Sequence, residues 1–334
     1  MSTATGTRML GGRMRLPADR GAWLRERGVY LAIVALVAFN LIFTPFYTVD
    51  NALQLLSRQL PPVLIVALGM AMVIGTGGID LSVGATMAVG SAVLAKFVAP
   101  ASGAGFHTSL VVAILACIVA GLLLGLVNGF AIAQLGIQPI VATLSLLVAG
   151  RGIALVITGG GLVELFVPFF KTLRLGKVAG VQYTMILGLS LALLVAILLR
   201  RTTFGYRLLA IGGNLRASVL AGLPVKRTLY TVYALSGVLS AIAGLLVTAQ
   251  IRASDPSYIG IQYELDAITA VVVGGTPLTG GRVRVLGTVA GAALMLMLTT
   301  TLTAHNEPHS VAQVVEAAII IAAVYIQRQR RSAE

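Results

Sequence analysis

The chain has 334 residues, of which 57% are hydrophobic and only 10% are charged. A water-soluble domain needs more charge on its surface, so the composition predicts an all-α polytopic membrane protein. The formal net charge is +13, with Arg and Lys gathered at the ends of apolar segments. We interpret this charge as a signal of membrane topology, which leaves a nucleic-acid surface as the weaker alternative. The single cysteine, Cys117, lies in an apolar run, so we expect a small buried side chain and no disulfide within the chain.

The N-terminal segment 1–28 is rich in arginine and precedes the first apolar run. A cleaved signal peptide would end at a small-residue site, whereas this run continues into TPFYTVDN. We therefore expect a cytoplasmic N-terminal tail at 1–28, followed by an uncleaved membrane helix.

About ten apolar segments, some of them short, have the length that a bilayer of about 30 Å requires. Together they predict a transmembrane domain over 29–327, followed by a cytoplasmic C-terminal tail at 328–334. In chain order the predicted spans are 29–47, 60–76, 81–98, 109–135, 139–158, 181–199, 228–250, 264–276, 285–303 and 311–326.

The distribution of basic residues predicts the orientation of these spans, because cytoplasmic loops carry more Lys and Arg. Ten spans that start inside return the C-terminus inside and place 200–227 in the cytoplasm. Loops 99–108 and 304–310 fall outside and contain neither Lys nor Arg. The exception is loop 159–180, which is basic on the predicted outside. An amphipathic or re-entrant piece at LVELFVPFFKTL would account for it.

The segment 200–227 is the one long polar passage in the middle of the chain, with six basic and no acidic residues. Asn214 is a preferred N-cap, because its side chain can accept from a free N–H of the first turn. Gly222, followed by Pro224, predicts the end of that helix. A helix of about two turns is not stable alone in water, so we expect it to dock on a partner.

Two glycine-rich stretches interrupt the apolar segments. In VIGTGGIDLSVG at 73–84, Asp80 separates two runs that are too close for an ordinary loop. Half-helices that meet inside the protein would explain this, because irregular backbone at membrane depth must be buried in protein or line a cavity. Two interpretations of Asp80 remain open. It caps the following half-helix and shapes a gate or path, or it is only a helix cap near the cytoplasmic interface.

The second stretch, AVVVGGTPLTGGRVRVLG at 270–287, repeats this pattern about 200 residues later. An apolar run, a glycine cluster with a polar turn and a helix rich in small residues follow one another in both. The echo suggests a possible internal duplication, as in many transporters. The alternative is that the small residues serve close helix packing alone.

A few further polar residues lie in or beside the spans and are candidates for a translocation path or gate. For Asn128 and Gln138 we favour hydrogen bonds between helices over contact with a substrate. Glu264 and Asp266 precede an apolar run, where acidic residues are ordinary partners of the helix dipole. For Arg151 we favour a structural pairing. The candidate path residues are Asp80, Asn128, Gln138, Glu264 and Asp266.

Several catalytic and cofactor motifs are absent from the sequence. It has no GxxxxGK[ST] phosphate loop, no dinucleotide fingerprint and no HExxH, and its three histidines are scattered. We therefore expect no enzyme activity, no bound cofactor and no metal site. A membrane domain powered by a separate protein fits these absences better than a proton-driven pump.

Three separated motifs in the expected order carry a family resemblance. GGIDLSVGA at 77–85, FGYRLLAIGGNLRASVLAGLPVKR at 204–227 and ELDAITAVVVGGTPLTGG at 264–281 resemble the permease subunits of bacterial ABC importers for ribose, arabinose and galactose. IQPIVATLSLLVAGRGIALVITGG at 137–160 is most similar to the galactofuranose branch of that family.

The resemblance implies a multi-pass permease of the bacterial cytoplasmic membrane, with both termini inside. It implies a second permease, identical or related, two ABC ATPase subunits that bind the ATP, and an extracytoplasmic sugar-binding protein. An ATP-independent channel or carrier and a membrane-embedded enzyme are the alternatives. In the family, the cytoplasmic loop that corresponds to 214–222 contains the coupling helix, which docks on the ATPase. The residues this assigns here are Asn214, Leu215, Arg216, Ala217, Ser218, Leu220 and Gly222.

Overall fold

The computed structural model describes residues 20–44, 47–98 and 109–308, together with 310, 311, 313–315, 317–319 and 321. The predicted loop 99–108, the C-terminal tail 328–334, most of the N-terminal tail and part of the span 311–326 lie outside the described residues.

The described chain is mostly helical, which confirms the helical class that the sequence predicts. Four two-residue strands, which were not predicted, add two short antiparallel pairs, β1 with β4 and β2 with β3. The elements in chain order are α1 (Arg20–Phe43), α2 (Val49–Gly75), α3 (Val83–Val98), α4 (Leu110–Ala133), α5 (Pro139–Thr158), β1 (Val163–Glu164), α6 (Pro168–Leu175), β2 (Lys177–Val178), β3 (Val181–Gln182), α7 (Tyr183–Arg201), α8 (Thr203–Gly213), α9 (Leu215–Leu220), α10 (Val225–Ile251), β4 (Ala253–Ser254), α11 (Tyr263–Val273) and α12 (Val285–Ala304).

Six of the described helices are long and apolar enough to cross a membrane, so the predicted count of about ten spans is not confirmed. They are α2, α4, α5, α7, α10 and α12. The apolar part of α1 and the whole of α3 are shorter, and α11 has only 11 residues. Two of the unconfirmed spans, α3 and α11, each adjoin a break in the helical backbone. A further one, 311–326, lies partly outside the described residues.

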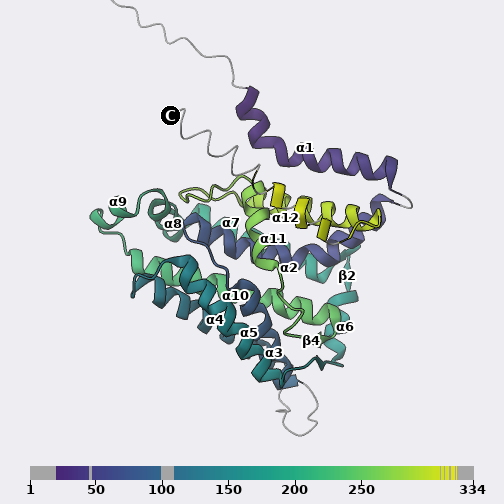
Figure 1. The fold of residues 1–334 in the computed structure, drawn as a ribbon, viewed down its shortest axis with the longest axis horizontal. Helices are drawn as coiled ribbons and strands as arrows, with labels where there is room; N and C mark the ends of the chain where they lie inside the picture. Colours follow the sequence, from purple (N-terminus) through teal and green to yellow (C-terminus); the bar gives the residue numbers. More distant parts are fainter. Residues whose placement is uncertain are drawn as a thin grey trace, which may run out of the picture.

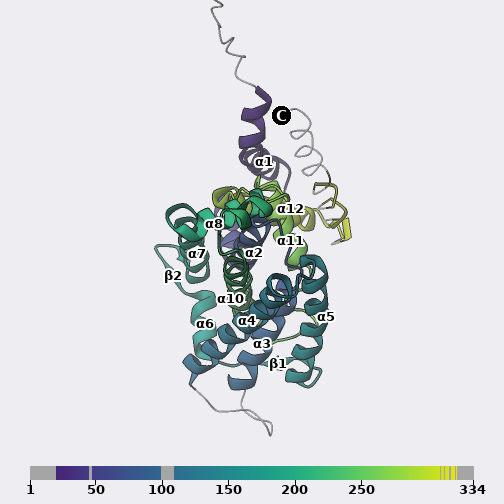
Figure 2. The same ribbon diagram turned by 90° about the vertical axis from the view of Figure 1, so that its left-hand side faces the viewer.

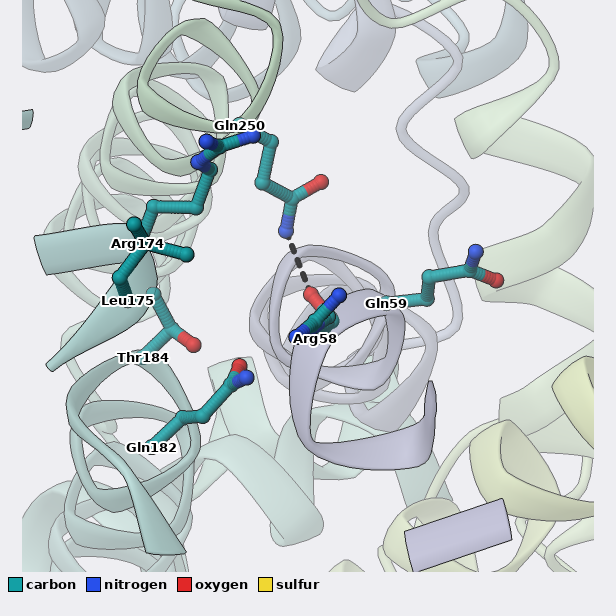
Figure 3. A pocket seen from close by; sticks show the side chains of 7 residues that line it. All are labelled: Arg58, Gln59, Arg174, Leu175, Gln182, Thr184 and Gln250. Atoms are coloured by element: carbon teal, nitrogen blue, oxygen red, sulfur yellow. Dashed lines mark hydrogen bonds between the residues drawn. The ribbon is translucent and has the colours of Figure 1, made fainter. Parts of the chain in front are cut away.

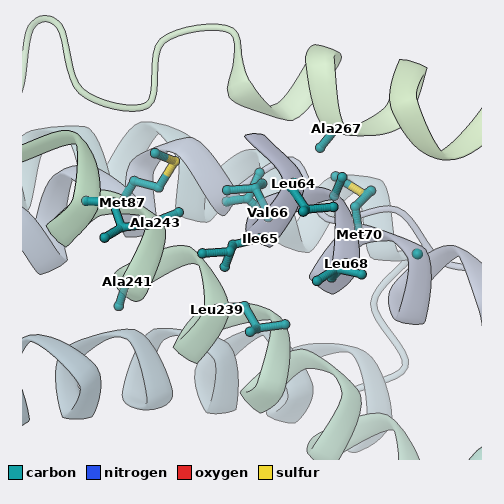
Figure 4. Close-up of a cluster of buried hydrophobic side chains, with 14 of the residues drawn as sticks. Leu64, Ile65, Val66, Leu68, Met70, Met87, Leu239, Ala241, Ala243 and Ala267 are labelled. Atoms are coloured by element: carbon teal, nitrogen blue, oxygen red, sulfur yellow. The ribbon is translucent and has the colours of Figure 1, made fainter. Parts of the chain in front are cut away.

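The helices form a bundle around α2 and α10 (Figures 1 and 2). Within their most apolar windows, α2 and α10 are each 83% buried, whereas α4, α5 and α7 are 22 to 28% buried. The apolar outer faces of those three helices match a lipid environment or a partner subunit. Figure 4 shows the centre of the core, where Leu64 and Ile65 of α2 lie between Ala267 of α11 and Leu239 of α10.

Small residues bring α4 and α10 close together. A Cβ placed on Gly121 of α4 would overlap the carbonyl oxygen of Gly237 in α10. Such small-residue contacts allow backbones to approach inside a membrane, where no hydrophobic effect drives helices together. Cys117 of α4 packs in the same core and is buried, as predicted.

The two ends of the bundle differ in construction. α8 and α9 lie at one end, whereas α6, β2 and β4 lie at the other (Figure 1). α10 starts just after α9 and stops just before β4, and its 27 residues separate the two ends by about 40 Å. We refer to them as the α9 end and the α6 end.

The basic loop at the α6 end is folded rather than extended. α6 buries Phe170 while Lys171 beside it is exposed, which confirms the amphipathic piece expected in this loop. The strand pair β1 and β4 ties the loop to the segment after α10. The basic residues of 159–180 therefore lie in a folded segment that contains a helix and short strands.

Candidate functional site

The first break, residues 76–82, begins where α2 ends. Gly77 adopts a left-handed conformation with φ of 84°, which favours glycine. The N–H of Gly78 then donates to the carbonyl of Val73 at 3.2 Å, which closes the helix end in the way that glycine C-caps do. The chain resumes as α3 at Val83, so the predicted interruption is confirmed.

Asp80 lies buried in this break, with 2% of its surface exposed. One carboxylate oxygen accepts from the backbone N–H of Ser82 at 3.0 Å and from its hydroxyl at 2.6 Å. The other oxygen accepts from the hydroxyl of Ser236 in α10 at 2.8 Å. The carboxylate therefore ties the break to the central helix.

These contacts correct both interpretations of Asp80 as a cap of α3. Its backbone partner, Ser82, precedes the helix, so the carboxylate forms a local turn and does not bind the first-turn N–H groups. Ser236 is the twelfth residue of the 27-residue α10, so Asp80 lies beside the middle of that helix. A position near the cytoplasmic end is thus excluded.

Asn128 of α4 joins the same cluster. Its amide nitrogen donates to the hydroxyl of Ser82 at 2.8 Å, which confirms the favoured interpretation of a hydrogen bond between helices. Tyr233 of α10 lies against the break as well. Its hydroxyl is buried without a hydrogen-bond partner, and a Cβ on Gly78 would lie 2.6 Å from it. The break, α4 and α10 thus meet in a polar cluster inside an apolar bundle.

The second break, residues 274–284, lies between α11 and α12 and repeats the helix end of the first. Gly275 has φ of 87°, and the N–H of Thr276 donates to the carbonyl of Val271 at 3.1 Å. In both breaks a glycine in the left-handed conformation follows the helix, and the N–H of the next residue donates to the carbonyl five residues before it. The break is closed by the Thr276 hydroxyl, which accepts from the N–H of Arg284 at 3.0 Å.

The short helix α9 forms where the sequence predicts it. The Asn214 side chain accepts from the N–H of Ala217 at 2.9 Å, and Gly222 has φ of 72°. The N–H of Leu223 donates to the carbonyl of Ser218 at 3.0 Å, which completes the stop. These contacts confirm the predicted start and end of the helix. The preceding helix α8 was not predicted.

Most of the exposed side chains of α9 are apolar. Leu220 is 89% exposed, and Val219 and Leu215 are more than half exposed. Ser218 is the buried residue of this helix. Arg216 is exposed as well, so the outer surface of the helix combines three large apolar side chains with one basic side chain.

The remaining sequence candidates lie at the starts of α5 and α11. Gln138 is exposed at the start of α5 and makes no capping hydrogen bond, so the expected bond between helices is not found there. Glu264 and Asp266 lie in the first turn of α11, as predicted. The Glu264 carboxylate packs against Gly84 in the first turn of α3, where a Cβ would lie 2.6 Å from Oε2.

Arg151 confirms its predicted structural role. Its guanidinium donates to the carbonyls of Pro256 at 2.8 Å and Ile259 at 2.5 Å. The Arg151 side chain therefore anchors the loop between β4 and α11 to α5. Among the described residues, no group of three His, Cys, Asp or Glu side chains is placed to hold a metal ion.

A cavity of about 180 Å³, lined mainly by residues with polar side chains, opens at the α6 end (Figure 3). Arg58 of α2 and Arg174 of α6 line it, with no acidic residue in its wall. Gln250 donates to the carbonyl of Arg58 at 2.5 Å. With the Gln182 amide oriented to satisfy both neighbours, its oxygen accepts from Arg58 Nε at 3.0 Å. The sequence did not reveal this cavity, because its wall comes from four separate segments.

These features define a multi-pass helical membrane protein with two interrupted helix pairs and a capped helix projecting from one end. Residues 52–324 match the family of the branched-chain amino acid transport system permease component, and the chain belongs to this family. It is therefore a transport permease subunit.

Individual relatives are similar over most of their length. The chain is 40% identical to the galactofuranose transporter permease protein YtfT of Escherichia coli over 84% of this chain and 80% of that one. It is 34% identical to the ribose import permease protein RbsC of Escherichia coli over 93% and 96%. It is 29% identical to the L-arabinose ABC transporter permease protein AraH of Azospirillum brasilense over 94% and 91%. No solved structure matches the chain.

Proposed function

We propose that this chain is the permease subunit of an ATP-driven importer for a monosaccharide, with galactofuranose and ribose as the first candidates. Two relatives named for these sugars are at least a third identical to it over most of the chain. The chain does no chemistry on the sugar, and a separate ABC ATPase binds the ATP.

The coupling to that ATPase runs through α9, and its exposed apolar side chains are the observation that carries this proposal. A six-residue helix is not stable by itself, even with both ends capped. Burying a fully exposed leucine contributes about 1.5 to 3 kcal/mol, so a groove that accepts Leu220 would stabilise the helix as well as bind it. Docking on the ATPase supplies such a groove.

The other partners follow from this orientation. The α9 end faces the cytoplasm of a bacterial cell, with both chain termini on the same side of the cytoplasmic membrane. A second permease, identical or related, completes the path. The extracytoplasmic binding protein delivers sugar at the α6 end, where Arg58 and Arg174 offer hydrogen-bond donors suited to hydroxyl groups.

For the translocation path we propose the first break and the start of α5. The Thr143 hydroxyl of α5 donates to the carbonyl of Ile79 at 3.3 Å, so the two segments are in contact. Asp80 and Asn128 stabilise the break through their hydrogen bonds to neighbouring residues. Gln138 is exposed, so its side chain can contact a solute. Glu264 and Asp266 position α11 beside α3.

The test is sugar uptake into proteoliposomes that hold the chain, its ATPase and its binding protein. A polar scramble of residues 215–220 should abolish uptake while the chain still inserts in the membrane. Leu220→Ser should lower uptake strongly. Leu162→Ser is the matched control, because Leu162 is an exposed leucine in the loop before β1, toward the α6 end.

Two results would contradict the proposal. Normal uptake by the scrambled variant would show that α9 does not couple the permease to the ATPase. Sugar uptake by the chain without ATP would favour an ATP-independent channel or secondary carrier.

A further inference from the structure

Three backbone segments meet directly beside the start of α9. They are the end of α2 at Gly75 and Gly77, the end of α8 at Gly212, and the second break at Gly280 and Gly281. The N–H of Gly281 donates to the carbonyl of Gly75 at 3.0 Å, which links the second break to the helix that leads into the first. We call this contact the glycine junction.

The junction has no room for side chains. A Cβ on Gly212 would overlap the carbonyl oxygen of Gly75 and would lie 2.6 Å from the nitrogen of Gly281. A Cβ on Gly280 would lie 2.8 Å from the nitrogen of Gly77 and 2.9 Å from the carbonyl oxygen of Gly212. At Gly212 and Gly280 the three segments therefore touch through backbone atoms, while the side chains of α8 and the second break pack beside them on Gly75.

The junction is also connected rigidly to α9. Gly212 is two residues before Asn214, the N-cap of α9, and the N–H of Asn214 donates to the carbonyl of Ala210 in α8 at 3.0 Å. Leu208 of α8 is fully buried, and a Cβ on Gly75 would lie 2.7 Å from its Cδ2. One end of α8 thus carries α9, and the same end packs on the end of α2 and on the second break, which contacts the first break at Gly77.

Contact through backbone atoms transmits a displacement more faithfully than contact through side chains. A side chain can absorb a small shift by changing rotamer, whereas closely packed backbones must move together. The two breaks are the irregular segments at which the helices can bend.

We propose that the glycine junction carries the movement of α9 to both breaks at once, and that Gly212 is its central positioning residue. This inference rests on the proposed coupling role of α9 and adds the route by which that coupling reaches the path. The substance transported plays no part in it.

The experiment compares Gly212→Ala with Gly213→Ala in the complete transporter in proteoliposomes. The two glycines are neighbours in α8, but a Cβ on Gly213 meets nothing within 4 Å. Gly212→Ala should bind the ATPase and hydrolyse ATP as the wild type does, while the sugar moved per ATP falls about tenfold, within the usual range of coupling between two sites. Gly213→Ala should keep the wild-type ratio.

A second pair covers the case in which Gly212→Ala does not fold. Leu208→Ala removes a buried contact of the junction without any backbone overlap, and Tyr206→Ala changes an exposed residue of the same helix. Leu208→Ala should lower the sugar moved per ATP by about fivefold, whereas Tyr206→Ala should leave the ratio unchanged.

The outcomes separate this inference from the proposed function. If the wild type shows no ATP-driven uptake, the proposed function fails. If the wild type transports and a folded Gly212→Ala matches Gly213→Ala in sugar moved per ATP, the junction is overturned. If Gly212→Ala does not fold, the coupling role of the glycine junction is overturned when Leu208→Ala moves as much sugar per ATP as the wild type.

Discussion

The two breaks end their first helices in the same way, yet they are held together by different chemistry. At the first break, the Ser236 hydroxyl of α10 donates to the carboxylate of Asp80. Asn128 of α4 donates to the hydroxyl of Ser82, which in turn donates to that carboxylate. At the second break, backbone meets backbone, since a Cβ on Gly287 would overlap the carbonyl oxygen of Gly274. The first break therefore depends on hydrogen-bonding groups, and the second depends on the absence of side-chain volume.

The largest effect on stability should come from added volume at the second break. In Gly287→Ala the new methyl group pushes α12 away from α11, which should lower the free energy of unfolding by about 1 to 3 kcal/mol or more. Thermal unfolding in detergent measures it. The control is Gly152→Ala in α5, where a Cβ meets nothing within 4 Å and alanine favours the helix. Equal midpoints for the two variants would contradict the volume argument.

At the first break, loss of hydrogen-bond acceptors should dominate. Asp80→Ala leaves the Ser82 N–H and the Ser236 hydroxyl without their acceptor and should destabilise the protein by about 1 to 3 kcal/mol. Asp80→Asn keeps one acceptor oxygen, so we expect a smaller loss and retained transport. The same unfolding assay, combined with uptake, checks both variants. If the asparagine variant is folded but inactive, transport needs the charge of the carboxylate.

A smaller loss is expected at the edge of the cluster. Asn128→Ala removes one hydrogen bond between helices, and such bonds in membrane proteins average about 0.6 kcal/mol and reach about 1.7 kcal/mol. Ser82 still donates to Asp80 in this variant. Gln138→Ala is the comparison, since that exposed side chain should change the unfolding midpoint very little. A larger loss from Gln138→Ala would reverse our account of the two residues.

The smallest effect on global stability should come from Gly222→Ala. The new Cβ has open space, but alanine at φ of 72° costs about 1 to 2 kcal/mol, and this cost falls on the end of α9 alone. Hydrogen exchange should therefore rise in 215–222 while the unfolding midpoint stays the same. A lower midpoint for the whole protein would show that α9 is part of the cooperative core.

Local features of this fold could be predicted from the sequence, because their causes are local. The cap at Asn214, the stop at Gly222 and the glycine clusters of both breaks each depend on a few neighbouring residues. The partners of Asp80 could not be predicted, since Ser236 is 156 residues away and serine is common in membrane helices. The same holds for Gly212, which lies in the motif at 204–227 but whose proposed role depends on its contacts with Gly75 and Gly281. The predicted number of spans is not confirmed, because the apolar runs beside the breaks form helices shorter than full spans.

The most direct test of the central claim is the uptake of labelled galactofuranose and ribose by proteoliposomes that contain the chain with its ATPase and binding protein, with and without ATP. Our account predicts accumulation of one of these sugars against its gradient only when ATP and both partners are present. Accumulation of a branched-chain amino acid in place of either sugar, or equal sugar uptake without ATP, would contradict it.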